Sequence, residues 1–392
     1  MLVKSNMFYE SSVAMYMKAI YVAALGTSLL MYVWVKKRLS NKLSNKSLSI
    51  TISRLYYYVY LGAVVFVSRF VMAYILKDNV VSIVNPGFNV GLGSYVNYGL
   101  AQIIKNQMYA NVIINTILAF ISCVVIKKIL LNIMANDTVA TVASLIYLFI
   151  PQSLVYVTEY IKYSYNVLFV LVGILLIIKI IDEVKNFSRK NKMYLLYALI
   201  LGVVASADIV LGGSYVFWSC LLIITTIATL YVDTTHIRIK CKNNLSYKLK
   251  RIAEKIEKIN ISKLIHVAII VLLIAGITTV AYEKISSANN YKIFNVENSI
   301  NILNNSRTYY IALLVFGLVF EIIGLLLKRK LDAKMLQVKM TYIIVGILTF
   351  FMVDGIYASA LFDTFLSLTV IINICNICYN REEKIKLLKA KN

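Results

Sequence analysis

Long apolar runs, separated by short polar connections, repeat from one end of this 392-residue chain to the other. Each run holds few charges and approaches the roughly 20 residues that an α-helix needs to cross a bilayer. We expect eleven such helices, at 13–35, 55–76, 109–131, 138–158, 164–181, 194–207, 211–231, 264–282, 309–327, 341–355 and 357–379. The pattern predicts an all-α fold, a polytopic membrane bundle of about 11 transmembrane helices.

The polar connections are too short to form a soluble domain, so we expect one transmembrane domain over 1–392. Its predicted parts are an N-terminal helix with a basic loop at 1–54, a helical core at 55–231, a basic loop at 232–263 and further helices at 264–392. Basic residues follow the first apolar run rather than precede it, and no small-residue cleavage pattern closes it. We therefore expect this run to stay as a helix rather than to be removed as a signal peptide.

The charges are distributed unevenly between alternate connections. One set of connections carries 32 of the 41 Lys and Arg residues and nine of the 18 acids, and so the whole net charge of +23. Lysine and arginine collect in the cytoplasmic loops of membrane proteins. The charge therefore predicts an N-terminus outside, a C-terminus in the cytoplasm, and a multi-pass position in the cytoplasmic membrane. This orientation requires an odd number of helices, which agrees with eleven.

The basic residues are spread over many short loops, which argues against a nucleic-acid partner. Contact with anionic lipids of the inner leaflet explains them better. Only two histidines are present, and Cys375 and Cys378 are more typical of small apolar residues near a helix end than of a metal pair. We expect no metal site and no cofactor, with a role for a divalent cation left open.

Charged residues within or beside the apolar runs are the default functional candidates, because their burial in a membrane is costly. They are Lys18, Arg69, Asp78, Glu159, Lys162, Asp208, Glu321, Asp354 and Asp363. We expect Glu159 to pair with Lys162, three residues away, and Lys18 and Glu321 to be structural.

Two long connections fall on the predicted outer side. The first, 77–108, turns at Asn85-Pro86-Gly87 and continues as a semi-polar, aromatic stretch at 88–104, which we expect to form a helix at the outer interface or one that re-enters it. An ordinary amphipathic connector is the alternative. The second, 283–307, is rich in asparagine and serine and offers Glu297 and Arg307 to the outer surface. Asparagine, tyrosine and carboxylate groups hydrogen-bond sugar hydroxyls, although asparagine is common throughout this chain.

The arrangement from Arg54 to Tyr231 resembles that of the GT-C class of membrane glycosyltransferases, such as protein O-mannosyltransferases and lipid A aminoarabinose transferases. The resemblance rests on four features: the helix that ends near Leu76, the long outer loop 77–108, the proline-containing hairpin around Pro151 and the short hairpin before Gly212-Gly213. No Walker, GxSxG or HExxH motif is present, which argues against chemistry driven by a cytoplasmic nucleotide.

The resemblance implies transfer of a sugar from a polyprenyl-phosphate-linked donor to an acceptor outside the membrane. A carboxylate would act as the general base on the acceptor hydroxyl, and Asp78 is the candidate. Arg69 and Arg307 would hold the donor phosphate. Tyr95 and Tyr98 would line the sugar or lipid path, and Glu159 and Glu297 are further candidates for substrate binding.

Other functions remain open. The family carries an acid a few residues before a loop tyrosine, whereas this chain has Asn89, Gly91 and Ser94 before Tyr95. A surface-polysaccharide polymerase or ligase, a non-enzymatic flippase or transporter of lipid-linked sugars, and a catalytically inactive scaffold are therefore the alternatives.

Overall fold

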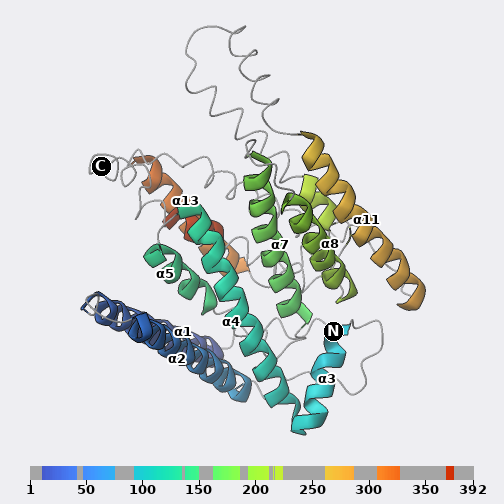
Figure 1. The fold of residues 1–392 in the computed structure, drawn as a ribbon. Coiled ribbons are helices and arrows are strands. Elements are labelled where there is room, and N and C mark those ends of the chain that lie inside the picture. Colours follow the sequence, from blue (N-terminus) through green and yellow to red (C-terminus); the bar gives the residue numbers. More distant parts are fainter. Residues whose placement is uncertain are drawn as a thin grey trace, which may run out of the picture. The chain divides into compact units, whose positions relative to one another are not determined.

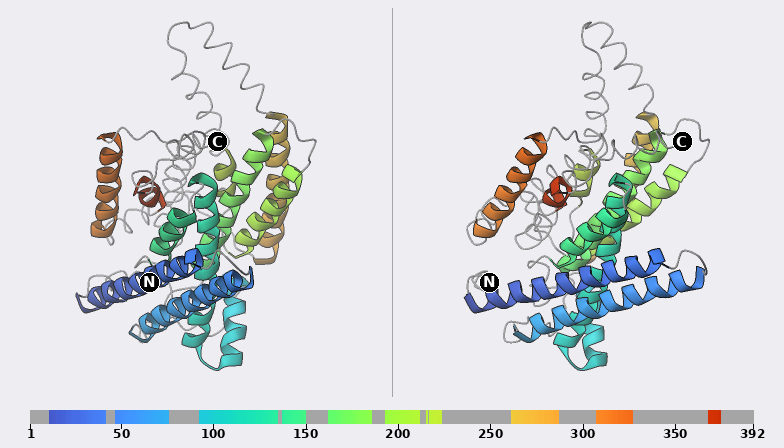
Figure 2. Two further views of the ribbon diagram at one scale, coloured as in Figure 1. Left: turned by 60° about the vertical axis from the view of Figure 1, so that its left-hand side comes forward. Right: turned by 90° about the vertical axis from the view of Figure 1, so that its left-hand side faces the viewer.

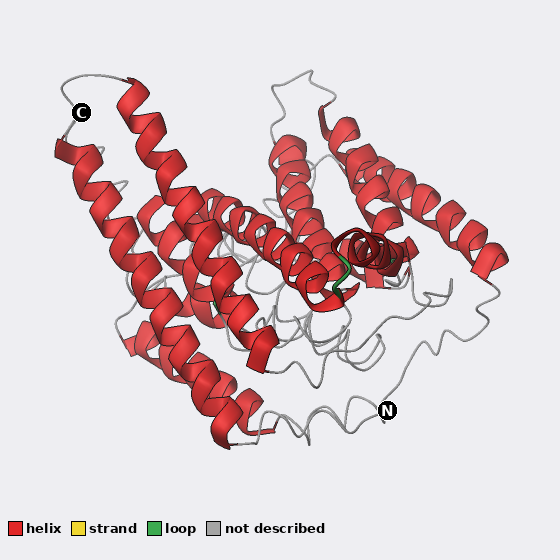
Figure 3. Cartoon of the chain, turned by 90° about the horizontal axis from the view of Figure 1, so that it is seen from below, coloured by secondary structure: helices red, strands yellow, loops and turns green. Residues whose placement is uncertain are grey.

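The structure is a computed structural model in which residues 11–41, 47–75, 92–134, 137–149, 162–185, 193–211, 215, 217–223, 261–286, 307–326 and 368–374 are described. Within these ranges all regular structure is helical and none is strand (Figure 3). The predicted all-α class is therefore confirmed for the described part of the chain.

The labelled helices follow one another along the chain (Figure 1). They are α1 (Ser11–Asn41), α2 (Ser47–Ile75), α3 (Leu92–Ile104), α4 (Gln107–Met134), α5 (Asp137–Leu148), α7 (Lys162–Lys185), α8 (Met193–Val210), α11 (Ile261–Ser286) and α13 (Arg307–Leu326). Shorter helical stretches lie at 217–223 and 368–374.

Five of the described helices are long and apolar enough to cross a membrane. The apolar segments are Ala19–Lys37, Leu55–Ile75, Gln107–Asn132, Met193–Val210 and Lys263–Ala281. They coincide with the predicted spans 13–35, 55–76, 109–131, 194–207 and 264–282. The chain therefore has the features of a membrane protein, as its hydrophobic pattern predicts.

The remaining predicted spans are described only in part. The run 164–181 lies within α7, and the run 309–327 coincides with α13 up to Leu326. The run 138–158 begins as α5, but this helix ends at Leu148. Only 217–223 and 368–374 are described within the runs 211–231 and 357–379, and 341–355 lies outside the described residues.

The helix predicted at 88–104 is present as α3. Its 13 residues correspond to about 20 Å, too short to cross a hydrocarbon core of about 30 Å. Its position at the outer interface stays a prediction. Lys105, with a φ of 57°, ends α3, and the Asn106 Oδ1 caps α4 by accepting a hydrogen bond from the Tyr109 N–H at 3.2 Å.

The chain divides into two compact units. Unit 1 comprises 1–127 and 137–168, and unit 2 comprises 128–136 and 169–392. The boundaries fall within α4 and α7, so each of these helices belongs to both units. The predicted single transmembrane domain stays a prediction.

Within unit 1, α1 and α2 form an antiparallel hairpin (Figure 2). The rings of Tyr32 and Tyr57 lie 5.9 Å apart, and those of Trp34 and Tyr56 lie 6.4 Å apart. Tryptophan and tyrosine favour the membrane interface. These pairs stand close to the basic residues that end α1, as expected for side chains at the edge of the hydrocarbon core.

Helix α2 also packs against α4. The rings of Phe70 and Tyr109 lie 5.7 Å apart, and those of Tyr58 and Phe120 lie 6.2 Å apart, so the two helices run in opposite directions. Helix α5 completes this core, whose buried members are Ala24, Val35, Tyr57, Leu61, Val65, Cys123, Leu145, Leu148 and Phe149.

At one end of unit 1, two lysines contact the first residues of α5. The Lys36 Nζ donates a hydrogen bond to the Thr138 Oγ1 at 2.8 Å, and Lys127 forms an ion pair with Asp137 at 3.0 Å. This end, where α1 finishes and α5 begins, is called the lysine end below. The opposite end, where α2 finishes and α3 joins α4, is called the α3 end.

Within unit 2, α8 and α11 run in parallel and in close contact. Lys263 lies over the Tyr194 ring, 5.3 Å from its centroid, near the start of both helices. Further along, the Thr278 Oγ1 donates a hydrogen bond to the Ser206 Oγ at 2.9 Å. Gly202 permits the approach, because a Cβ there would lie 2.8 Å from the Ile274 Cδ1.

A second contact in unit 2 joins α7 to the stretch 217–223. The Trp218 ring lies over Gly173, and the Trp218 Nε1 donates a hydrogen bond to the Asp208 Oδ2 at 2.9 Å. Elsewhere in the unit, the Asn373 Nδ2 donates to the Gly317 carbonyl of α13 at 3.3 Å. Polar side chains thus join helices that are otherwise apolar.

Candidate functional site

Arg69 lies within a helix that is otherwise apolar. It is six residues from the end of α2, and only 1% of its surface is exposed. A cationic side chain buried in a membrane-capable helix is costly, and such residues generally mark a functional site or a specific pairing. The partners of Arg69 therefore decide what it does.

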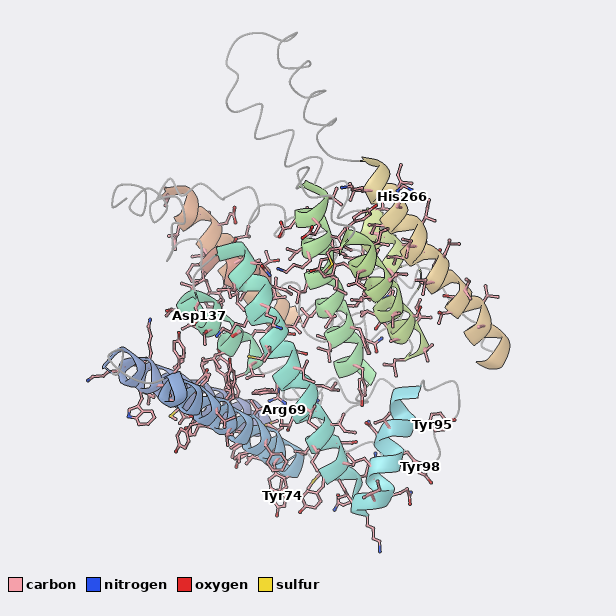
Figure 4. All side chains as sticks on the ribbon, in the orientation of Figure 1. Arg69, Tyr74, Tyr95, Tyr98, Asp137 and His266 are labelled. Atoms are coloured by element: carbon pink, nitrogen blue, oxygen red, sulfur yellow. The ribbon has the colours of Figure 1, made fainter. Side chains whose placement is uncertain are left out.

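Two groups of unit 1 accept hydrogen bonds from the guanidinium of Arg69, the residue that Figure 4 labels. The Arg69 Nε donates to the Asn115 Oδ1 of α4 at 2.7 Å, and the Nη2 approaches the Leu148 carbonyl at 3.4 Å. Leu148 is the last residue of α5, and carbonyls at a helix C-terminus carry partial negative charge. Arg69 therefore has a structural role, because it caps the buried end of α5.

This structural role leaves part of the guanidinium unused. The buried Arg69 Nη1 has no hydrogen-bond partner among the described residues, and no described carboxylate pairs with Arg69. The guanidinium stays protonated in proteins. Asn115 and the Leu148 carbonyl are neutral, so the described part of the site has a net positive charge and a donor without a described partner, which suit an anion.

An amide face on α4 stands beside Arg69. Gln107, Asn111 and Asn115 follow one another at intervals of four, which places them on one face of the helix. The Gln107 Nε2 donates to the Asn111 Oδ1 at 3.4 Å, and both asparagines are buried. The face begins at the α3 end and leads toward Arg69.

Two further amides are buried in unit 1. Asn97 of α3 is 1% exposed, and its Oδ1 has no described partner. Asn166 of α7 is fully buried, and neither its Nδ2 nor its Oδ1 has one. The buried hydroxyls of the same unit are satisfied only in part, because the Ser28 Oγ and the Tyr57 Oη have no described partner either. Ser68, Thr141 and Ser144 donate to carbonyls of their own helices.

Aromatic residues of α2 bracket the position of Arg69. Seventeen residues separate Tyr57 from Tyr74, a rise of about 26 Å that approaches the thickness of a hydrocarbon core. Arg69 stands five residues from Tyr74, or about 8 Å. It therefore lies in the third of the helix nearest the α3 end.

The predicted site residues are described unevenly. Arg69 is central to the site, whereas Asp78, Glu159 and Glu297 lie outside the described residues. Arg307 is the first residue of α13 in unit 2, and its side chain is also outside the described part.

The two predicted tyrosines both come from α3 (Figure 4). Tyr95 is 37% exposed and Tyr98 is half-buried. The α3 residues that turn inward are instead Asn97 and Ala101.

Two of the other charged candidates, Asp208 and Glu321, belong to unit 2. Asp208 is fully buried in unit 2 beside Trp218, and Glu321 is half-buried in α13. Asp354 and Asp363, with the side chains of Lys18 and Lys162, lie outside the described part. Among the described residues, no group of three or more His, Cys, Asp or Glu side chains could hold a metal ion.

Comparison of the chain with protein-family models, curated proteins and solved structures finds no match. The resemblance to GT-C glycosyltransferases therefore stays a prediction.

Proposed function

We propose that this chain is a glycosyltransferase of the cytoplasmic membrane, which transfers a sugar from a polyprenyl-phosphate-linked donor to an acceptor at the outer face. The observation that carries the proposal is Arg69, a buried cation with an open Nη1 and no described carboxylate partner. A lipid-borne phosphate is an anion of the membrane whose oxygens match such a donor. Guanidinium groups bind phosphate oxygens through charge-assisted hydrogen bonds.

The proposed topology has eleven spans, an external N-terminus and a cytoplasmic C-terminus. Support comes from the lysine end of unit 1, where Lys36 and Lys127 lie together. With this end in the cytoplasm, basic loops contact anionic lipids of the inner leaflet. The α3 end and Arg69 then belong to the outer part of the membrane, where the donor sugar and the acceptor are located.

The proposed reaction is substitution at the anomeric carbon of the donor. Asp78 takes the proton of the acceptor hydroxyl, the acceptor oxygen bonds to the anomeric carbon, and the bond from that carbon to the phosphate oxygen breaks. The leaving group is polyprenyl phosphate. Arg69 stabilises the negative charge that develops on this phosphate, in a site with few competing water molecules. Arg307, Tyr95, Tyr98, Glu159 and Glu297 remain proposed substrate contacts.

A flippase for lipid-linked sugars is the second candidate function. Helix α5 has 12 residues and ends beside Arg69. Helices that stop within the membrane at a charged group are typical of transporter binding sites. This observation makes Arg69 compatible with movement of a lipid phosphate without any transfer of its sugar.

Reconstituted protein separates the two functions. Proteoliposomes that contain polyprenyl-phosphate [14C]glucose and receive cell-envelope material as the source of acceptor should transfer the label to that acceptor with the wild type. Arg69→Gln should lower the rate about 100-fold or more, as loss of a group that stabilises a transition-state charge does. Arg69→Lys should lower it less, because it keeps the charge. Lys36→Gln, at the lysine end, is the control and should keep the wild-type rate.

Three outcomes would contradict parts of the proposal. Full activity of Arg69→Gln would exclude its role at the phosphate, and full activity of Asp78→Asn would exclude Asp78 as the base. Movement of the labelled lipid between leaflets without any transfer would favour the flippase. Because Arg69 also caps α5, the unfolding temperature of each variant is measured in parallel.

A further inference from the structure

Asn115 of α4 orients the buried guanidinium of Arg69. Its Oδ1 accepts a hydrogen bond from the Arg69 Nε at 2.7 Å, and only 2% of the Asn115 surface is exposed. The Arg69 Nη2 contacts the Leu148 carbonyl at 3.4 Å. The guanidinium is planar and rigid, so contacts at the Nε and the Nη2 from two other helices fix the plane of the group and the direction of its Nη1.

The partner that α4 offers to Arg69 is an amide rather than a carboxylate. Aspartate has nearly the same size and shape as asparagine, and a carboxylate accepts stronger hydrogen bonds from a guanidinium. A carboxylate is also a usual partner of a buried arginine, because a buried charge without a counter-charge lowers stability. The fold would therefore hold Arg69 more firmly with aspartate at position 115.

The described part of unit 1 supplies no counter-charge to Arg69. The one acidic side chain in this part is Asp137, which forms an ion pair with Lys127 at the lysine end. The Arg69 Nη1 is buried and has no partner among the described residues. The amide of Asn115 thus keeps the guanidinium in place and leaves its positive charge for another anion.

We infer that Asn115 is a positioning residue of the proposed phosphate site: it fixes the direction of the Arg69 guanidinium and, because it is neutral, leaves the phosphate of the lipid-linked donor as the counter-charge. The inference rests on the proposed function, in which Arg69 holds this phosphate. Asn115 acts through Arg69 and needs no contact with the lipid-linked donor. Its neutrality, and not its hydrogen bond alone, is the property that the site requires.

Asn115→Asp separates the hydrogen bond from the charge. It keeps an acceptor for the Arg69 Nε and adds a negative charge with which the phosphate must compete. The full chain in nanodiscs of phosphatidylcholine is titrated with polyprenyl phosphate. We expect Asn115→Asp to bind this probe at least about tenfold more weakly than the wild type. Its unfolding temperature without the probe should stay the same or rise, because a buried cation gains a counter-charge.

Asn132→Asp is the matched control. Asn132 also belongs to α4, and its Oδ1 accepts a hydrogen bond from a cation, the Lys179 Nζ, at 3.4 Å. Seventeen residues, or about 26 Å, separate it from Asn115 along the helix. Its affinity for polyprenyl phosphate should stay within about twofold of the wild type. An equal loss of affinity in both variants would assign the effect to any added negative charge and overturn the role of Asn115.

A double-mutant cycle with Asn115→Leu tests whether Asn115 acts through Arg69. Leucine removes the acceptor at similar size, so it should lower the affinity for polyprenyl phosphate at least about fivefold and lower the unfolding temperature. In an Arg69→Gln background the same substitution should change the remaining affinity by less than about twofold, because the group that Asn115 orients is absent. Independent effects of the two substitutions on affinity would overturn the inference.

The failure of this inference can be told apart from the failure of the proposed function. If Arg69→Gln loses affinity for polyprenyl phosphate while Asn115→Asp binds it as tightly as the wild type, the phosphate site stands and the role of Asn115 is wrong. A lower unfolding temperature of Asn115→Asp would show that Arg69 already has a counter-charge within the protein, and would also overturn the inference. If Arg69→Gln binds the probe as tightly as the wild type, the proposed function fails, and the inference fails with it.

Discussion

At the scale of single residues, polar groups in this chain differ in how far the fold uses them. Asp208 accepts a hydrogen bond from Trp218 and holds two segments of unit 2 together. Arg69 of α2 donates hydrogen bonds to α4 and α5, and its Nη1 has no described partner. Burial alone therefore does not identify a functional residue. Buried polar atoms without a partner are the more specific signal, because they lower the stability of the fold and form no hydrogen bond that holds it together.

Gly173 gives a prediction at this scale. A Cβ at Gly173 would lie 2.5 Å from the Cη2 of Trp218, which is fully buried and donates to Asp208. Gly173→Ala must displace the indole and weaken this hydrogen bond. We expect a loss of about 1–3 kcal/mol in the free energy of unfolding, measured by denaturation in detergent micelles.

The control is Gly62→Ala in α2. No atom outside its own helix lies within 4 Å of a Cβ at Gly62. Alanine favours the helix by about 0.5–1 kcal/mol relative to glycine, so this variant should be equally stable or slightly more stable. Equal stability changes in both variants would show that the Trp218 ring does not depend on Gly173.

The sequence predicts Arg69 but not the buried asparagines of unit 1. A charge in an apolar run is rare enough to be noticed, whereas asparagine is common throughout this chain, in loops as well as in helices. A signal was present in the interval of four between Gln107, Asn111 and Asn115 within an apolar run. The unsatisfied atoms of Asn166 could not be predicted, because they depend on what surrounds the amide in three dimensions.

At the scale of elements, hydrophobic runs predict where helices occur better than where they end. The apolar run from 138 continues to 158, but Pro151 interrupts it, and a proline disfavours continuation of the helix that precedes it, in agreement with an end at Leu148. The Arg69 guanidinium then donates to the Leu148 carbonyl at this helix end, a tertiary contact that hydrophobicity does not predict. Helix α3 was predictable because its glycines and polar residues distinguish it from a span.

The pairing of α8 with α11 gives a prediction at this scale. A Cβ at Gly202 would meet the Ile274 side chain, with the Cδ1 at 2.8 Å and the Cβ at 3.2 Å. Gly202→Ala should force the helices apart and lower the free energy of unfolding by about 1–3 kcal/mol. In an Ile274→Val background, which lacks the Cδ1, the same substitution should cost less than half as much.

A double-mutant cycle measures this coupling. Residues in direct contact generally couple by about 0.5–3 kcal/mol, whereas distant residues add independently. Gly202→Ala combined with Leu196→Ala is the reference pair, because Leu196 lies on the exposed side of α8, six residues or about 9 Å from Gly202. Additive effects of Gly202→Ala and Ile274→Val would contradict a close contact between the two helices.

At the scale of the whole chain, helix directions and charge placement are two separate arguments for one topology. Helices α8 and α11 are parallel, as they must be if the span predicted between them crosses the membrane once. In unit 1, α1 and α2 are antiparallel, and the contacts of Lys36 and Lys127 lie at the end where α1 finishes. Hydropathy predicts neither the contacts nor the side of the membrane; the positive-inside rule supplies the side.

Cysteine labelling tests this orientation. In a background without the five native cysteines, Lys105→Cys places a thiol at the α3 end and Lys37→Cys places one at the lysine end. Both side chains are exposed. A membrane-impermeant maleimide added to intact cells should label Lys105→Cys only, and both variants should be labelled after permeabilisation. Labelling of Lys37→Cys alone in intact cells would invert the topology and place Arg69 in the inner part of the membrane, where an outer-face transferase could not use it.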